Sequence, residues 1–232
     1  MKKILISVIL LLNCIAAMAQ SAGGNTTVNE SRWLLSADVN FAYRLGKTPD
    51  GLSAAAKDYN DDLKSGISYS LGLYYKFHKY MGVGLKFNSF SSEASISNTY
   101  AFSPNGQEGY TTISDDINIF FVGPAFIFDR KFGIGHFTAE TALGYMEYRN
   151  NMYILGNYKY TGETMGATLG ASYKFEVLKG LSVGPQITLV TGSVTEFDVK
   201  GPNGYSVTFD KDNDEAESLW HFDAGISATY RF

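Results

Sequence analysis

The segment WHFDAGISATYRF, residues 220–232, alternates between two kinds of residue along its whole length. The apolar residues are Trp220, Phe222, Ala224, Ile226, Ala228, Tyr230 and Phe232. The residues between them are His221, Asp223, Gly225, Ser227, Thr229 and Arg231. A period of two over this length predicts a β-strand with one apolar and one polar face. Strands of soluble sheets usually have about 5–6 residues, whereas a tilted strand that spans a bilayer needs about 9–11. The pattern therefore favours a membrane-spanning strand.

The same alternation recurs in three earlier segments, residues 35–45, 67–77 and 165–175. No apolar-face position in these segments carries a charge. This absence is expected where the face meets lipid, because Lys or Arg at mid-depth costs about 2–4 kcal/mol. Weaker alternating segments begin near Gly82, Ile113, His136 and Leu181. We therefore expect eight strands.

The connections between these strands alternate in length. The short connections lie at residues 79–81, 129–135 and 178–180, and the long ones lie near 46–65, 91–112, 149–162 and 191–217. Short periplasmic turns and long outer loops are typical of outer-membrane barrels, whose even strand number leaves both ends at the short-turn side. The sequence thus predicts an all-β fold, an eight-stranded antiparallel up-and-down transmembrane β-barrel over residues 32–232.

The first 19 residues have the pattern of a cleavable signal peptide. A basic start and an apolar run, residues 4–12, precede a small-residue cleavage site at residues 17–19. Residues 20–31 are predicted to form a flexible lead-in. Cys14 is the only cysteine and lies in the segment expected to be removed. We therefore expect neither a disulfide nor a cysteine-ligated metal in the mature chain.

The composition narrows the class of partner. The net charge is −4 and no basic stripe is present, so nucleic acid is not an expected partner. The chain has 16 Tyr, 16 Phe and 24 Gly but only 18% charged residues, which is unusual for a soluble domain. Its mean hydropathy is near zero, as expected when only every second strand residue faces lipid.

Three of the predicted strands end alike, in SLGLYYKF (70–77), TLGASYKF (168–175) and ISATYRF (226–232). Their outward aromatic residues are predicted to form an inner interfacial girdle of Tyr75, Phe77, Tyr173, Phe175, Tyr230 and Phe232. The basic residue of each ending, Lys76, Lys174 and Arg231, is predicted to point into the barrel at one common height.

Together, the signal peptide, the eight amphipathic strands and the terminal Tyr-Arg-Phe resemble the outer-membrane β-barrel family of diderm bacteria, near the barrel domain of outer-membrane protein A and its small relatives. The resemblance is architectural and covers almost the whole mature chain. It implies a location in the bacterial outer membrane, in contact with lipid and lipopolysaccharide. It also implies that Tyr230 and Phe232 form an assembly signal read by the barrel assembly machinery.

The interior of an eight-stranded barrel is only wide enough for its own side chains. The predicted inward polar residues are Asp38, Arg44, Lys76, Lys86, Glu140, Lys174, Glu176, Gln186, Asp223 and Arg231. Because buried charges must be paired, their mixed signs predict a salt-bridge and hydrogen-bond network that plugs the lumen. A narrow ion path is the alternative.

Two prolines, Pro124 and Pro185, fall within predicted strands, and proline cannot donate to the ladder of a closed barrel. Each follows Val-Gly close to the short-turn end. We expect a β-bulge at each proline. In the strand that holds Pro124, aromatic residues occupy both odd and even positions, and a bulge would also account for this.

No catalytic, cofactor or metal site is predicted. His221 and Asp223 with a nearby serine imitate the groups of a lipid A-modifying enzyme, but an inward His–Asp pair is more often structural. Residues 210–215, DKDNDE, begin like a calcium loop but have Glu215 where that loop needs glycine. A solvated acidic loop is therefore favoured.

The loop RNNMYILGNYKYTG, residues 149–162, is rich in tyrosine. Girdle or loop packing is favoured for these rings, with partner binding as the alternative. We expect a non-enzymatic outer-membrane barrel with a structural or surface-interacting role exerted through its long loops. The alternatives are a lipid A-modifying enzyme, a narrow channel and an accessory subunit of an envelope complex. The sequence identifies no surface ligand.

Overall fold

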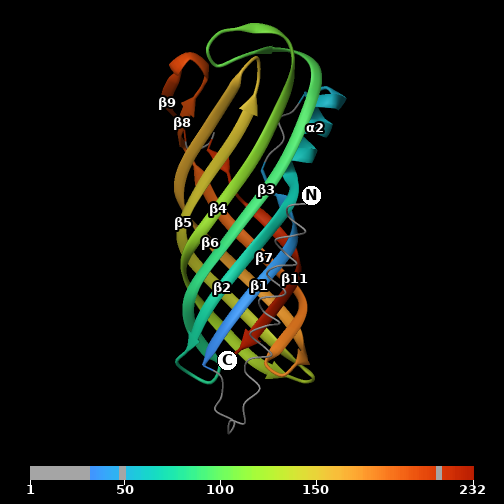
Figure 1. Cartoon of the computed structure of the whole chain (residues 1–232), viewed down its shortest axis with the longest axis vertical. Coiled ribbons are helices and arrows are strands. Elements are labelled where there is room, and N and C mark those ends of the chain that lie inside the picture. Colours follow the sequence, from blue (N-terminus) through green and yellow to red (C-terminus); the bar gives the residue numbers. More distant parts are fainter. Residues whose placement is uncertain (1–31, 47–50, 213–215) are drawn as a thin grey trace.

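The computed structural model describes residues 32–46, 51–212 and 216–232. The predicted signal peptide, 1–19, and lead-in, 20–31, lie outside the described residues. The rest forms a closed antiparallel barrel (Figure 1). Its ring strands are β1 (Trp33–Arg44), β2 (Ser65–Lys76), β3 (Met81–Phe102), β4 (Glu108–Phe132), β5 (Gly135–Tyr153), β6 (Asn157–Leu178), β7 (Leu181–Val194) and β11 (His221–Arg231).

The last strand closes the ring. β11 pairs with β7 on one side and with β1 on the other, from Leu34 opposite Arg231 to Arg44 opposite His221. Every other ring strand pairs with the strand that follows it in sequence. The predicted eight-stranded up-and-down antiparallel barrel is therefore confirmed.

Side-chain exposure alternates along the strands as the pleat of a β-strand requires. Inward residues are mostly buried, and large apolar residues face outward around the barrel, with Leu143 65% and Leu169 63% exposed. Such a belt is unfavourable against water over so large an area. It matches the apolar band, about 25 Å tall, that transmembrane barrels present to lipid.

Two of the predicted long loops are wrong over most of their length, because the strands continue through them. β3 pairs with β4 as far as Phe102 opposite Glu108, and β5 pairs with β6 as far as Tyr153 opposite Asn157. The continuous run of outward apolar residues on β3 ends before Glu93, and large exposed rings return on this strand only at Tyr100 and Phe102. The extended strands therefore rise beyond the apolar belt, and a short-turn end and a tall end can be distinguished (Figure 1).

The tall end is enlarged by a hairpin from the last long connection. β8 (Glu196–Lys200) and β9 (Ser206–Asp210) pair with each other, and β8 also pairs with β6. A 3-10 turn, η1 (Pro202–Gly204), joins them, and β10 (Glu217–Ser218) pairs with β7. The parts of β3, β4, β5 and β6 beyond the apolar belt, together with this hairpin, are called the platform below.

The first long connection contains a helix that the sequence pattern does not predict, α2 (Ala54–Lys64). Ser53 caps its first turn by accepting a hydrogen bond from the Ala56 amide at 3.3 Å. The helix lies against the tall part of β3, where Ser92 Oγ donates to the Leu63 carbonyl at 2.8 Å. Figure 1 shows it on the side of the tall end. Among the described residues, no helix is both long enough and apolar enough to cross a membrane.

The predicted bulges at the two prolines are wrong. β3 and β4 keep one register through Pro124, and β7 and β11 keep one register through Pro185. Only the ladder on the other side of each proline is interrupted, and it resumes in the same register. Each proline faces outward, so the barrel loses local ladder bonds there without inserting a residue. The mixed parity in β4 arises because Phe121 and Ile127 face inward as apolar core residues.

The apolar belt generates a stability prediction. Replacing outward Leu71 by lysine should lower the free energy of unfolding by about 2–4 kcal/mol, because the charge would face lipid. The matched control is Ser95→Lys, an exposed position on β3 beyond the belt, which should change little. Urea unfolding in lipid vesicles measures both values. Equal effects of the two substitutions would contradict the belt.

Candidate functional site

The lumen near the short-turn end is organised around one buried carboxylate, Asp129. Arg231 Nη2 donates to Asp129 Oδ1 at 2.8 Å, and Thr138 Oγ1 donates to the same oxygen at 3.0 Å. Lys76 Nζ lies 3.8 Å from Asp129 Oδ2. Arg231 also donates to Ser182 Oγ at 2.8 Å. This rim cluster joins side chains from β2, β4, β5, β7 and β11, so it closes the lumen at this end.

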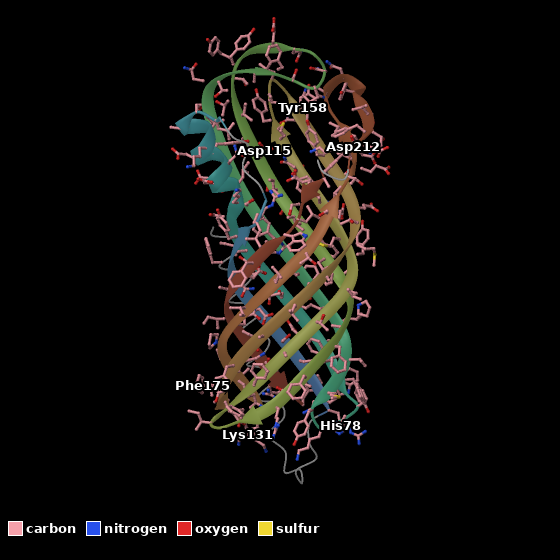
Figure 2. The ribbon with its side chains drawn as sticks, turned by 180° about the vertical axis from the view of Figure 1, so that it is seen from behind. His78, Asp115, Lys131, Tyr158, Phe175 and Asp212 are labelled. Carbon is pink, nitrogen blue, oxygen red and sulfur yellow. The ribbon has the colours of Figure 1, made fainter. Side chains whose placement is uncertain are left out.

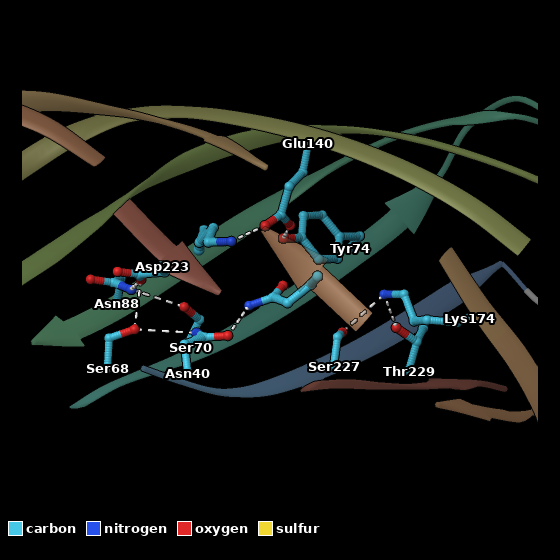
Figure 3. A network of polar contacts seen from close by, with 12 residues as sticks. Asn40, Ser68, Ser70, Tyr74, Asn88, Glu140, Lys174, Asp223, Ser227 and Thr229 are labelled. Carbon is cyan, nitrogen blue, oxygen red and sulfur yellow. Dashed lines mark hydrogen bonds and ion pairs between the residues drawn. The ribbon is translucent and has the colours of Figure 1, made fainter. Parts of the chain in front are cut away.

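A second polar group, the middle network, lies deeper in the barrel (Figure 3). Lys86 Nζ donates to Glu140, and Tyr74 OH donates to Glu140 Oε2 at 2.6 Å. Two glycines make room for these side chains. A Cβ at Gly72 would collide with the Tyr74 ring, and one at Gly170 would lie 2.8 Å from Glu140 Oε1. The buried charges of Lys86 and Glu140 are therefore paired, as burial demands.

The middle network continues around Asp223. Ser68 Oγ donates to Asp223 Oδ2 at 2.6 Å, and Asn88 Nδ2 donates to it at 3.2 Å. Asn40 Nδ2 donates to Ser68 at 3.2 Å and its carbonyl accepts from Gln186 at 2.7 Å. Figure 3 shows these side chains reaching toward one another from different strands. The chain of contacts crosses the lumen from β7 to β3.

Lys174 belongs to a third set of partners. Its Nζ donates to Ser227 at 3.1 Å and to Thr229 at 2.6 Å, both on β11 (Figure 3). A cavity of about 10 Å³ lies beside Lys174, roughly the room of a single water. Asp38 lines this cavity, and its Oδ1 has no hydrogen-bond partner in the described part of the chain.

An apolar layer fills the lumen on the tall-end halves of the strands. This apolar plug consists of Phe90, Ile117, Ile119, Phe121, Met146, Val190, Val194 and Leu219. All of these residues are almost completely inaccessible. The sequence pattern predicts a network of charged and polar side chains as the filling of the barrel and does not reveal this layer. The same cluster also includes Leu34 and Ile127, which lie among the polar groups nearer the short-turn end.

Most of the predicted lumen residues lie inside the barrel, but two have other roles. Glu176 is exposed and accepts a hydrogen bond from the Gly180 amide at 3.2 Å, so its placement in the lumen network is wrong. Glu176 lies on the same side of β6 as the inward Lys174 and pairs with Ser182, but it sits at the end of the barrel, where its side chain is exposed. Arg44 is buried, but its Nη2 contacts Glu217 of β10 at 2.7 Å, at the tall end.

The predicted aromatic girdle lies at the short-turn end. Tyr75, Phe77, Tyr173, Phe175 and Phe232 are partly or fully exposed on the outer surface. Figure 2 places Phe175 near this end, at the level of Lys131 and His78. Tyr230 differs, because only 5% of it is exposed, and its ring stacks on that of Phe232 with centroids 5.8 Å apart. Tyr230 therefore packs beneath Phe232 and is shielded from the surroundings.

The histidine considered for catalysis is sealed inside the barrel. His221 is fully buried, its ring lies 5.1 Å from that of Phe90, and its Nε2 is 3.8 Å from Asp223 Oδ1. The nearby hydroxyl of Ser68 donates to Asp223 and makes no contact with the histidine among the hydrogen bonds of the described residues. A serine nucleophile needs a base within hydrogen-bond reach. Among the described hydrogen bonds, Ser68 and His221 do not meet this requirement.

A second candidate site lies at the tall end. The tall-end cavity has a volume of about 190 Å³ and is lined by Tyr148, Asn150, Met152, Tyr160, Phe197, Phe209, Lys211 and Glu217. The rings of Phe197 and Phe209 are stacked with centroids 5.6 Å apart, and Tyr148 meets Phe197 edge-on at 5.9 Å. The Lys211 ammonium lies 5.3 Å from the Phe197 ring centre. The cavity is therefore an aromatic pocket with charged groups at its wall.

A buried carboxylate lies directly behind this wall. Asn150 donates to Asp115, and Tyr59 of α2 donates to the other oxygen of the same carboxylate. Burial raises the pKa of Asp115, and the Asn150 hydrogen bond opposes this shift. Burial, and secondly the charge of Asp115, raise the pKa of Tyr160. Figure 2 shows Asp115 on the tall end, beyond the apolar belt.

The loop residues singled out in the sequence fall around this cavity. Tyr158 is buried and Tyr160 lines the cavity, so these rings pack inside the platform, as favoured, while Tyr153 is 42% exposed. Of the acidic segment, Asp210 ends β9 and Glu217 pairs with Arg44, and residues 213–215 lie outside the described residues. Within the described ranges, no group of three or more His, Cys, Asp or Glu is placed to hold a metal ion.

Comparison with known proteins rests on the fold alone. No protein-family model matches the chain, and no curated protein matches it. A major outer membrane protein from Thermus thermophilus is similar in structure, with a TM-score of 0.56, 11% identity, and coverage of 88% of this chain and 100% of that chain. Ail of Yersinia pestis, in complex with sucrose octasulfate, has a TM-score of 0.49, 12% identity, and coverage of 88% and 99%. Neisserial surface protein A has a TM-score of 0.49, 10% identity, and coverage of 86% and 97%.

The fold is that of the small β-barrels of bacterial outer membranes. The Thermus thermophilus structure carries this conclusion, because the likeness covers the whole of that chain. The predicted family resemblance is confirmed at the level of the fold. Barrels of this fold carry their long loops on the extracellular side and their short turns on the periplasmic side.

The middle network generates a prediction about charge pairing. Lys86→Met should destabilise the barrel by about 3–5 kcal/mol, because it leaves Glu140 buried without its cation. The double variant Lys86→Met/Glu140→Leu should recover most of this loss, since an apolar pair needs no counter-charge. Urea unfolding in vesicles measures both. A double variant no more stable than the single one would contradict the pairing.

The buried carboxylate generates a prediction about pH. Because burial raises its folded-state pKa, neutral Asp115 contributes stability that is complete below the ordinary pKa of 3.8 and is lost as the pH rises through the raised value. Backbone amides of α2 should therefore be better protected from hydrogen exchange at about pH 4.5 than at about pH 7.5, after correction for intrinsic rates. Asp115→Asn should abolish the difference. A pH difference that survives in this variant would show another cause.

Proposed function

We propose that the chain is a non-enzymatic outer-membrane barrel with a sealed lumen, which acts at the cell surface through its platform. The observation that carries the proposal is the division of the molecule into two parts. The barrel below has its interior filled by the rim cluster, the middle network and the apolar plug. The platform above has strands, a hairpin and a cavity of its own.

The filled lumen supports a role other than conduction. In the apolar plug, the side chains of Phe121, Met146 and Val190 are completely buried. The cavity beside Lys174 has room for about one water. Eight strands leave an interior that side chains fill. An ion would have to displace both the apolar plug and paired charges, so a narrow channel is the weaker alternative.

The platform supports a surface role because its own strand pairs and apolar contacts hold it in one shape. Strand pairs continue through it to Tyr153 and Phe102, and a small apolar cluster around Tyr158 and Val199 holds its inner face together. Binding residues are commonly placed on loops carried by a rigid scaffold. Here the scaffold reaches above the apolar belt and presents both an outer face and a cavity.

A lipid A-modifying activity is the rival function, and it would depend on His221 with Asp223. Both groups are fully buried in the lumen, whereas such an enzyme must bring its catalytic groups to lipid. We therefore propose a structural role for the pair. For assembly, we propose that Tyr230 and Phe232 are read by the barrel assembly machinery in the unfolded strand, before Tyr230 is buried beneath Phe232.

The purified protein in planar bilayers should produce no conductance steps, with a large porin in the same bilayer as positive control. Because the lumen is filled from side to side, even a raised voltage should leave the baseline flat. Regular conductance steps that scale with protein concentration would overturn the sealed-lumen proposal.

In parallel, the lipid A mass spectrum of cells that express the chain should be identical to that of cells expressing His221→Ala. A modification lost only in this variant would favour the enzyme.

A further inference from the structure

The tall-end cavity has walls that attract a positive charge. Four aromatic side chains, Tyr148, Tyr160, Phe197 and Phe209, line it. The faces of aromatic rings carry negative charge density and attract cations within about 6 Å of the ring centre. The wall already does so within the chain, because the Lys211 ammonium lies 5.3 Å from the centre of Phe197.

One buried acceptor in the wall of the cavity has no donor. Asn150 lines the cavity and is only 6% exposed, and its carbonyl oxygen has no hydrogen-bond partner in the described part of the chain. Its amide nitrogen is committed to Asp115. A buried acceptor without a donor costs roughly 1–3 kcal/mol. A ligand that brings an N–H group into the cavity would recover part of this cost.

The charges around the cavity also leave one carboxylate uncompensated. Glu217 is paired with Arg44 at 2.7 Å. Asp115 receives hydrogen bonds from Tyr59 and Asn150, and no salt bridge joins it to a described Lys or Arg side chain. Its charge acts on Tyr160, which lines the cavity. The site therefore combines aromatic walls, an unused acceptor and, behind the wall, a buried carboxylate that has hydrogen bonds but no salt bridge to a described Lys or Arg.

We propose that the tall-end cavity is a binding site for the ammonium group of a small organic amine. The proposal deepens the proposed surface function and rests on it, because the cavity must open to the external medium. The volume of about 190 Å³ is far larger than the space of a single water and suits a small organic ion. Lys211, in this view, is a tethered ammonium that competes with the ligand for the face of Phe197.

Met152 lines the cavity and provides a local reporter. The protein, labelled with ¹³C at its methionine methyl groups and held in nanodiscs, is titrated with 2-phenylethylammonium and separately with the neutral 2-phenylethanol. Only the ammonium should shift the Met152 methyl signal in a saturable way. Met81 and Met165 face outward and report any partitioning of either probe into lipid.

Three variants test the parts of the site. Asp115→Asn and Phe197→Leu should each weaken ammonium binding roughly fivefold to tenfold, through loss of charge and of the ring face. Lys211→Met should tighten it roughly threefold by removing the competitor. Lys200→Met, at the exposed end of β8, is the matched control and should change nothing. Heat-modifiable gel migration shows that each variant is folded.

Two results would overturn the proposal. Equal saturable shifts with 2-phenylethanol would show an apolar pocket without preference for charge, and an unchanged Met152 signal with both probes would show no site at all. Both measurements use the unaltered protein, so a variant that fails to fold does not affect them. If the Met152 methyl signal does not change, while the bilayers show no conductance and lipid A is unmodified, the ammonium site alone is overturned. If the bilayers show conductance steps, the proposed function is overturned.

Discussion

The constraint on which the structure depends is the closure of the hydrogen-bond ladder between β1 and β11. A closed ladder has no free edge, so the strands can lie in lipid with their backbone groups paired, apart from the local losses beside Pro124 and Pro185. It also divides the side chains into two sets that cannot mix, because successive residues point to opposite faces. The outward side chains contact lipid, and the inward side chains contact one another.

These two sets differ in how far a sequence reveals them. The outer set is predictable, because each position needs only to be apolar, and the segment 220–232 shows this directly. Inward charges such as Lys86 and Lys174 follow from the same parity. Their partners do not, since Lys86 and Glu140 are 54 positions apart and Ser68 and Asp223 are 155 apart. Strand stagger around the ring decides these contacts, and no local pattern records it.

The predictions of strand bounds and bulges fail where the two faces of a strand do not differ in polarity. β4 is apolar on both sides, with Phe121 and Ile127 inward and Phe126 outward, so alternation is hidden and the pattern imitates a bulge. The platform escapes prediction for the opposite reason. Beyond the apolar belt, most residues of β3 from Glu93 to Thr99 are polar or small, and a strand without apolar alternation resembles a loop. The tall-end cavity is therefore out of reach of the sequence, although Tyr160 of its wall lies in the tyrosine-rich segment.

The repeated strand endings show how one short pattern serves different contacts. Gly72 and Gly170 occupy the same place in SLGLYYKF and TLGASYKF, and the first makes room for Tyr74 while the second makes room for Glu140. The lysines four residues later also diverge. Lys76 lies near Asp129, whereas Lys174 donates to hydroxyls of β11. The pattern sets the height of a small residue, an outward ring and an inward cation on each strand. What each of them meets depends on the neighbours that the closed ring supplies, because the strands are staggered as they tilt around the axis.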